Sequence, residues 1–116
     1  MEPNRATPNL KTDDLESSLR FYVDVLGFEV KMNLGWIATV GAPSYPRVLV
    51  SLLTEDATAP VVPDLSVGVD DVDAAYEAVV ATGAEIVHPL TDEEWGVRRF
   101  FVRDPGGRVV NVLQHV

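Results

Sequence analysis

Residues 70–86, "DDVDAAYEAVVATGAEI", decide the fold, because residues 13–30, "DDLESSLRFYVDVLGFEV", repeat their organisation. Each stretch begins with an acidic pair, continues with apolar residues at helical spacing, and passes through a glycine into a strand-like segment. The offset between the two copies is 57 positions at the acidic pairs and 56 positions at the glycines. We therefore interpret the chain as an internal duplication.

Each copy has the signals of one amphipathic helix. In the first copy Asp13 is the expected N-cap, with Glu16 three residues later, and Gly27 is the expected stop. The apolar residues that recur at helical spacing, and that we expect to face inward, are Leu15, Leu19, Tyr22 and Leu26. In the second copy the corresponding inward residues are Tyr76, Val79 and Val80.

Strand-like runs surround both helices. The expected strands are residues 5–12, 28–33, 47–53, 64–69, 97–103 and 108–114, with one more starting near Ile86. Asp104-Pro105-Gly106-Gly107 predicts a tight turn between the last two strands, because proline presets φ and glycine accepts positive φ. The chain is thus predicted to be a single domain with a first module at about 5–56, a connector at 57–63 and a second module at 64–116.

The composition excludes several classes of protein. The chain has 116 residues, no cysteine and a net charge of −9, so disulfides, thiolate metal sites and a cysteine nucleophile are absent, and polyanions such as nucleic acid are disfavoured partners. Its apolar runs are far shorter than the roughly 20 residues of a membrane helix. The N-terminus lacks the order of a secretory signal, so we expect a cytoplasmic protein without a membrane partner.

Three segments together resemble the vicinal-oxygen-chelate family, which includes glyoxalases, bleomycin-resistance proteins and extradiol dioxygenases. They are "TDDLESSLRFYVDVLGFEV" (12–30), "VGVDDVDAAYEAVVATGAEIV" (67–87) and "WGVRRFFVRDPGGRVVNVL" (95–113). The resemblance implies an α+β fold in which two βαβββ modules form a half-open mixed-sheet barrel with a cleft. It also implies a homodimer and a small-molecule ligand, but not one chemistry, because this scaffold carries enzymes as well as pure binders.

Enzymes of the family hold a divalent metal with His, Glu or Gln side chains from four strands. The resemblance places Thr7, Ser51, Asp64 and Asn111 at those four positions. This set contains one carboxylate and no imidazole, which is too few strong donors for a divalent ion. We therefore expect no metal and no cofactor. Asp64 is also readable as a solvated carboxylate at a strand start, and Asn111 as a polar residue that either finds a partner or lines a wet cavity.

Two tryptophans and an arginine complete the predicted ligand site. Trp95 follows three carboxylates, so it and Trp36 are candidates to stack on a flat or cationic ligand, although both equally suit a core-capping role. Arg98 and Arg99 point to opposite faces of a strand, and the family pattern selects Arg98, which pairs either with a ligand oxygen or with an acidic side chain such as Asp64. His88 and His115 are expected to be exposed bystanders.

The function expected first is that of a metal-free binding protein, which sequesters a hydrophobic, aromatic or cationic compound in the manner of bleomycin-resistance proteins. The first alternative is a metal-dependent enzyme of the glyoxalase, lyase or dioxygenase kind, in which the metal activates a substrate oxygen. The second is a metal-independent enzyme in which Asp64 or Glu94 acts as general base. No catalytic residue is assigned, and an enzyme is the less favoured reading.

Overall fold

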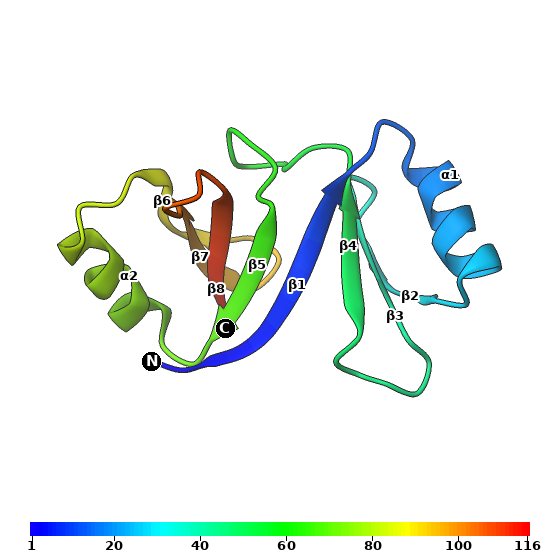
Figure 1. Ribbon diagram of the computed structural model, residues 1–116, viewed down its shortest axis with the longest axis horizontal. Helices are drawn as coiled ribbons and strands as arrows, with labels where there is room; N and C mark the ends of the chain where they lie inside the picture. The colour runs from blue at the N-terminus through cyan, green and yellow to red at the C-terminus, as the bar shows by residue number, and fades with distance from the viewer. The chain divides into compact units, whose positions relative to one another are not determined.

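The computed structural model describes residues 1–116 and contains eight strands, two α-helices and one π-helical segment. In chain order these are β1 (Pro3–Lys11), α1 (Leu15–Arg20), η1 (Phe21–Val25), β2 (Glu29–Asn33), β3 (Ile37–Gly41), β4 (Leu49–Leu53), β5 (Leu65–Val69), α2 (Val72–Ala81), β6 (Ile86–Glu93), β7 (Val97–Arg103) and β8 (Val109–His115). Figure 1 follows this order by colour. The chain divides into two compact units: the first is Thr7–Val62, and the second combines Met1–Ala6 with Pro63–Val116.

The two units have the same strand pairing. In the first, β1 pairs with β4 in parallel, and β4, β3 and β2 follow one another in antiparallel order. In the second, β5 pairs with β8 in parallel, and β8, β7 and β6 are antiparallel neighbours. The predicted α+β fold of two βαβββ modules is confirmed. The N-terminal part of β1 belongs to the second unit, where it lies next to β5.

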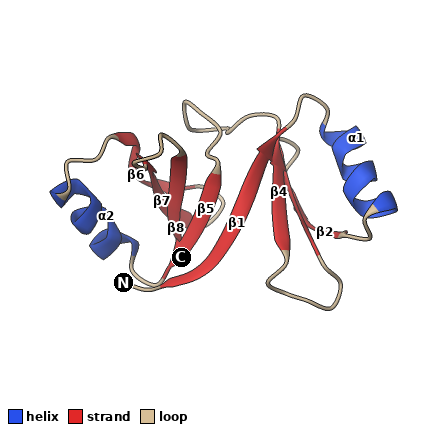
Figure 2. Ribbon diagram, viewed as in Figure 1, coloured by secondary structure: helices blue, strands red, loops and turns tan.

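In the second unit α2 lies beside the strands (Figure 2), and a packed hydrophobic core lies between the helix and one face of these strands. Val72 and Ala75 of α2 are buried against Phe100 and Val112, and the Tyr76 ring meets the Phe100 ring edge-on at 5.0 Å. Burial of side chains this large is the main favourable term in folding. Because side chains alternate along a strand, the residues next to Phe100 and Val112 lie on the opposite face.

The first helix begins one residue later than predicted. Its N-cap is Asp14, not Asp13: the Asp14 carboxylate accepts hydrogen bonds from Ser17 N at 3.0 Å and from Ser17 Oγ at 2.7 Å. These two bonds lower the pKa of Asp14. Asp71 caps α2 in the same way through Ala74 N. The two acidic pairs of the repeat thus supply equivalent helix caps.

The π-helical segment η1 explains why the repeat offset falls from 57 to 56. The first copy has one more residue than the second between its cap and its glycine. The Leu26 N–H bonds to the Phe21 carbonyl at 3.2 Å, five residues back, so the extra residue is accommodated within a widened turn. Gly27 then ends the helix at φ +81, as predicted.

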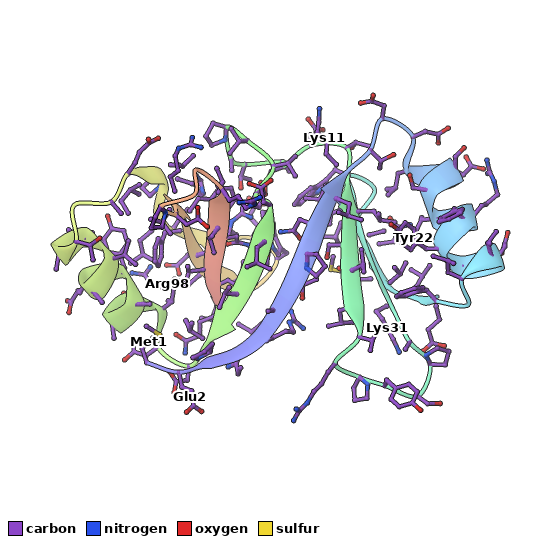
Figure 3. The ribbon with its side chains drawn as sticks, in the orientation of Figure 1. Met1, Glu2, Lys11, Tyr22, Lys31 and Arg98 are labelled. Carbon is purple, nitrogen blue, oxygen red and sulfur yellow. The ribbon has the colours of Figure 1, made fainter.

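The helix of the first unit is less deeply packed than α2. No residue of α1 or η1 is buried, although the half-buried Tyr22 ring meets Phe28 edge-on at 5.7 Å (Figure 3). Phe21, Val25 and Leu26 are 51%, 69% and 52% exposed. The prediction that Leu26 faces inward is therefore wrong, because the π-helical turn rotates it away from the α-helical stripe.

No helix of the chain is both long enough and apolar enough to span a bilayer.

Candidate functional site

The two metal-ligand positions of the first unit hold neutral hydroxyl groups. Thr7 lies on β1 and Ser51 on β4, and both are buried. The Ser51 hydroxyl is 2.7 Å from the Thr39 hydroxyl on the neighbouring strand β3, with which it forms a hydrogen bond. Across the parallel pair, Ser51 is in register with Asn9 of β1. The Ser51 and Thr39 hydroxyls thus satisfy each other within the sheet, as buried polar groups normally do.

The two positions of the second unit are also engaged. Asp64 is exposed, and its carboxylate accepts a hydrogen bond from Val109 N at 2.8 Å while its own N–H donates to the Val109 carbonyl. Asp64 thus closes the start of the β5–β8 ladder. The Asn111 amide donates from Nδ2 to Ser66 Oγ at 3.0 Å. Its Oδ1 is buried and has no hydrogen-bond partner.

This donor set does not fit the divalent metal that the family resemblance implies. Three of the four side chains are neutral oxygen or amide groups, and the fourth, Asp64, already holds a backbone N–H. No three His, Cys, Asp or Glu side chains of the chain are grouped so that they could hold a metal ion. A stable divalent site needs several imidazole, thiolate or carboxylate ligands. The side chains at these four positions therefore do not provide a divalent metal site.

A cluster of buried ionisable side chains lies on the opposite face of the second unit's sheet from α2. Arg99 of β7 donates from Nε to Glu93 Oε2 at 2.6 Å, and His88 Nε2 lies 3.4 Å from the same oxygen. His88, Glu93 and Arg99 are 7%, 9% and 4% exposed. The expectation that His88 is an exposed bystander is wrong.

Aromatic rings cover the guanidinium of Arg99. Its central carbon is 5.0 Å from the Trp95 ring centre and 4.8 Å from the Phe101 ring centre. The His88 ring is 5.1 Å from the Phe101 ring. The cation on the Trp95 ring is therefore an arginine of the chain itself. Cation–π attraction to the two rings stabilises its buried guanidinium.

One row of side chains runs across this face. Ser66 of β5 is in register with Asn111 of β8, Asn111 with Phe101 of β7, and Phe101 with His88 of β6. Paired residues on neighbouring strands share a face, so the amide and the imidazole flank the phenyl ring on either side. Apart from the 3.4 Å approach to Glu93, His88 Nε2 has no polar partner, and Asn111 Oδ1 has none. Buried unpaired atoms of this kind are rare in folded proteins.

The other predicted residues lie elsewhere. Arg98 is on the α2 side of the sheet, where its guanidinium is 2.9 Å from Asp73 and 3.2 Å from Asp92 (Figure 3). Hydrogen bonds to Asp73 and then to Asp92 raise its pKa. Arg98 therefore forms ion pairs, the second of the two expected roles, but with Asp73 and Asp92 and not with Asp64. A ligand oxygen would have to displace these carboxylates. Trp36 is half-buried just before β3, and its carbonyl accepts the Thr54 N–H.

The buried cluster escaped prediction for two local reasons. The first is Pro89, because a proline in the sequence indicates a loop at residues 88–89. In the structure β6 continues through them: it is an edge strand that pairs only with β7, and its register shifts on both sides of His88. Proline is tolerated at such edge and bulge positions. The alternation along β7 also leaves Arg99 and Phe101 on one face and Phe100 on the other. The paired aromatic residues after "RR" were the signal that Arg99 is the buried arginine.

A shallow groove of the second unit contains a second histidine. Its volume is about 350 Å³, and it is lined by residues of β1, β5 and β8, including Arg5 and His115, and by Asp70, which follows β5. Arg5 donates to His115 Nε2 at 3.1 Å. Partial burial and the positive charge of Arg5 lower the pKa of His115. Both effects favour the neutral imidazole, the form whose Nε2 accepts the hydrogen bond from Arg5.

Sequence comparison decides the family. The family model of the Glyoxalase/Bleomycin resistance protein/Dioxygenase superfamily matches residues 6–112. The chain belongs to this superfamily. A curated relative, a probable lactoylglutathione lyase from Vibrio parahaemolyticus, is 26% identical over 119 residues, which cover 91% of this chain and 86% of the relative.

Solved structures agree with this assignment. A superfamily member from Vibrio splendidus 12B01 matches with a TM-score of 0.71 and 26% identity over 95% of this chain and 97% of that one. A methylmalonyl-CoA epimerase from Streptomyces coelicolor, in complex with 2-nitronate-propionyl-CoA, matches with a TM-score of 0.73 over 99% of both chains at 18% identity. At that identity the epimerase supports the fold alone.

Proposed function

We propose that this superfamily member is a small-molecule-binding protein that recognises its ligand without a protein-held metal. The observation that carries the proposal is that three of the four metal-ligand positions hold side chains already engaged within the sheet. Ser51 bonds to Thr39, Asp64 to the backbone of Val109, and Asn111 to Ser66. Side chains that serve the sheet in this way are poor competitors for a divalent cation, whereas hydroxyl and amide groups suit hydrogen-bonded recognition of an organic ligand.

The charges of the second unit favour a neutral ligand with hydrophobic or aromatic character. Of the three carboxylates next to Trp95, Asp92 faces Arg98 and Glu93 faces Arg99. The Arg99 guanidinium covers the ring of Trp95. A cationic ligand, which the sequence also suggested, would have to compete with this internal cation. Of the hydrophobic, aromatic and cationic classes of ligand, the cationic class is therefore the least favoured.

Binding in the presence of a chelator tests the proposal. The purified chain is screened with a library of flat aromatic compounds by thermal shift, in parallel with and without EDTA. Ligand-dependent stabilisation follows the ratio of ligand concentration to Kd, so hits should raise the melting temperature equally in both buffers. Hits that vanish with EDTA and return with added zinc or nickel would refute metal-free binding.

A metal-dependent lyase is the competing function, because the curated relative is named a probable lactoylglutathione lyase. In that case the chain should show lactoylglutathione lyase activity once zinc, nickel or cobalt is supplied, and Asp64→Ala should abolish it. We expect no activity above the uncatalysed rate with any of the three ions.

A metal-independent enzyme would show turnover that survives chelation. For this role Glu93, not the exposed Glu94, is the buried carboxylate.

Two further features complete the proposal. We expect the chain to form a homodimer. The exposed apolar side chains of Phe21, Val25 and Leu26 support this state, and light scattering of the purified chain measures it.

Sequestration of a toxic aromatic compound would make the protein a resistance factor. Expression in a sensitive bacterium should then raise the inhibitory concentration of that compound, and expression of a non-binding variant should not.

A further inference from the structure

The row Ser66–Asn111–Phe101–His88 on the second unit's sheet indicates what the ligand must offer. Asn111 is 6% exposed, and its Nδ2 is used by Ser66 while its Oδ1 has no partner. A carbonyl oxygen can only accept a hydrogen bond. A group that completes this amide therefore has to carry an O–H or N–H.

The surroundings restrict the rest of that molecule. Phe101 lies directly beside Asn111 on the same face, and His88 lies beyond it. The Phe101 ring is fully buried and is contacted by the Arg99 guanidinium at 4.8 Å and by the His88 ring at 5.1 Å, so a ligand ring reaches it only by taking the place of one of them. The opposite charges of Glu93 and Arg99, 2.6 Å apart, offset each other, so this pair does not favour an ionic ligand. With strands about 4.8 Å apart, Asn111 and His88 are separated by roughly the length of one ring with its substituents.

We propose, on the basis of the metal-free binding function above, that the ligand is a small neutral compound with a flat ring and a hydroxyl or N–H donor. The ring lies on Phe101, where it takes the place of the Arg99 guanidinium or the His88 ring, and the donor bonds to Asn111 Oδ1. Position 111, where the family's enzymes carry a metal-binding glutamate, thus becomes a hydrogen-bond acceptor for the organic ligand. Because Oδ1 is inaccessible in the free chain, the side chains that cover it move aside when the ligand enters.

Phenol and anisole test the donor requirement, because they share a ring and differ in the presence of an O–H. Isotope-labelled full-length chain is titrated with each compound in EDTA and followed by NMR at the Asn111 side-chain amide. Phenol should bind at least about tenfold more tightly than anisole, which corresponds to one well-formed hydrogen bond. Equal binding of the two compounds, tighter binding of anisole, or binding of neither would overturn the proposal.

Two variants complete the experiment. Asn111→Leu keeps the size of the side chain and removes the acceptor, so phenol and anisole should bind alike, and the melting temperature of the free chain should stay the same or rise because the unpaired oxygen is gone. Val110→Ala, one residue away on the α2 side, should lower stability but keep the preference for phenol. If Asn111→Leu preserves the preference, or lowers the melting temperature by more than about 4 °C, Asn111 has a structural role instead. Zinc binding would refute the proposed metal-free function, whereas the preference for phenol over anisole would still be measurable.

Discussion

The two modules share one topology but differ in how they use it. In the second unit, α2 buries Val72 and Ala75 against the sheet, and the opposite face carries a buried Arg99–Glu93 pair. In the first unit, no residue of α1 or η1 is buried, and its strands contain no buried charged side chain. The duplicated pattern is thus sufficient to specify strand order and helix caps, whereas the packing and the chemistry depend on the individual residues that each copy carries.

This difference has a consequence for function. A buried ion pair costs desolvation free energy and is kept in place only by a scaffold that is itself well packed. The second unit supplies such a scaffold, with Phe100 and Val112 under the same strands that carry Arg99 and Asn111. The ligand-recognition chemistry is therefore expected to depend on the second unit's core more than on the first unit's helix.

The largest expected contrast is between two phenylalanines. Phe100→Ala removes a fully buried ring that packs edge-on against Tyr76, and it should lower the free energy of unfolding by about 4 kcal/mol. Phe21→Ala, at a ring that is 51% exposed, should change it by no more than about 0.5 kcal/mol. Urea denaturation measures both. Similar losses in the two variants would show that the first helix is covered in solution, for instance by a second copy of the chain.

A second test concerns the buried ion pair. Glu93→Gln removes the buried negative charge 2.6 Å from Arg99 Nε and should cost about 3 kcal/mol of unfolding free energy. Glu29→Gln, at an exposed ion pair with Lys31 in the first unit, should cost less than about 1 kcal/mol. Equal and small effects would mean that water reaches Arg99 and that the cluster is not buried.

A one-residue deletion in each helix sharpens the comparison further. Deletion of Asp24 removes the extra residue of the first copy and should convert η1 into regular α-helix, with a change in unfolding free energy within about 1 kcal/mol. Deletion of Glu77 shifts the phase of α2 and should cost at least about 2 kcal/mol, because Val79 leaves the core. Circular dichroism and urea denaturation follow both deletions. Loss of folding on deletion of Asp24 would contradict the assignment of the π-helical turn to the extra residue.

The smallest effect is the pH dependence of His115. Its pKa in the folded chain is below the usual 6.5, so between these two values the unfolded chain binds more protons than the folded one. Stability should therefore fall as pH drops below about 6.5, by less than about 1 kcal/mol because the ring is partly solvated. His115→Gln should remove this component, and Arg5→Gln should reduce it. A stability difference between wild type and His115→Gln that does not vary with pH would contradict it.

The sequence predicted the architecture because its signals are local and repeated. The caps at Asp14 and Asp71 and the Asp104–Gly107 turn, closed by a hydrogen bond from Gly107 N to the Asp104 carbonyl at 2.9 Å, act within a few residues. The exact N-cap was missed by one position, because two adjacent aspartates are equally good caps by type.

The candidate site was less predictable. His88 and Glu93 become neighbours of Arg99 only through pairing between β6 and β7, and a proline within an edge strand hides that pairing in the sequence. The partners of Arg98 and Asn111 likewise come from other elements, at Asp73 of α2 and Ser66 of β5. Contacts of this kind depend on register, which the hydrophobic pattern specifies only where one face of a strand is clearly apolar.

Metal analysis of the intact chain tests the central claim most directly. The protein is stripped with chelator, dialysed against zinc, nickel or manganese, and analysed for bound metal together with Asp64→Ala. We predict far less than one ion per chain for each metal, with no difference between wild type and variant. One divalent ion per chain that is lost in Asp64→Ala would contradict the account and make this protein a metal-dependent member of its superfamily.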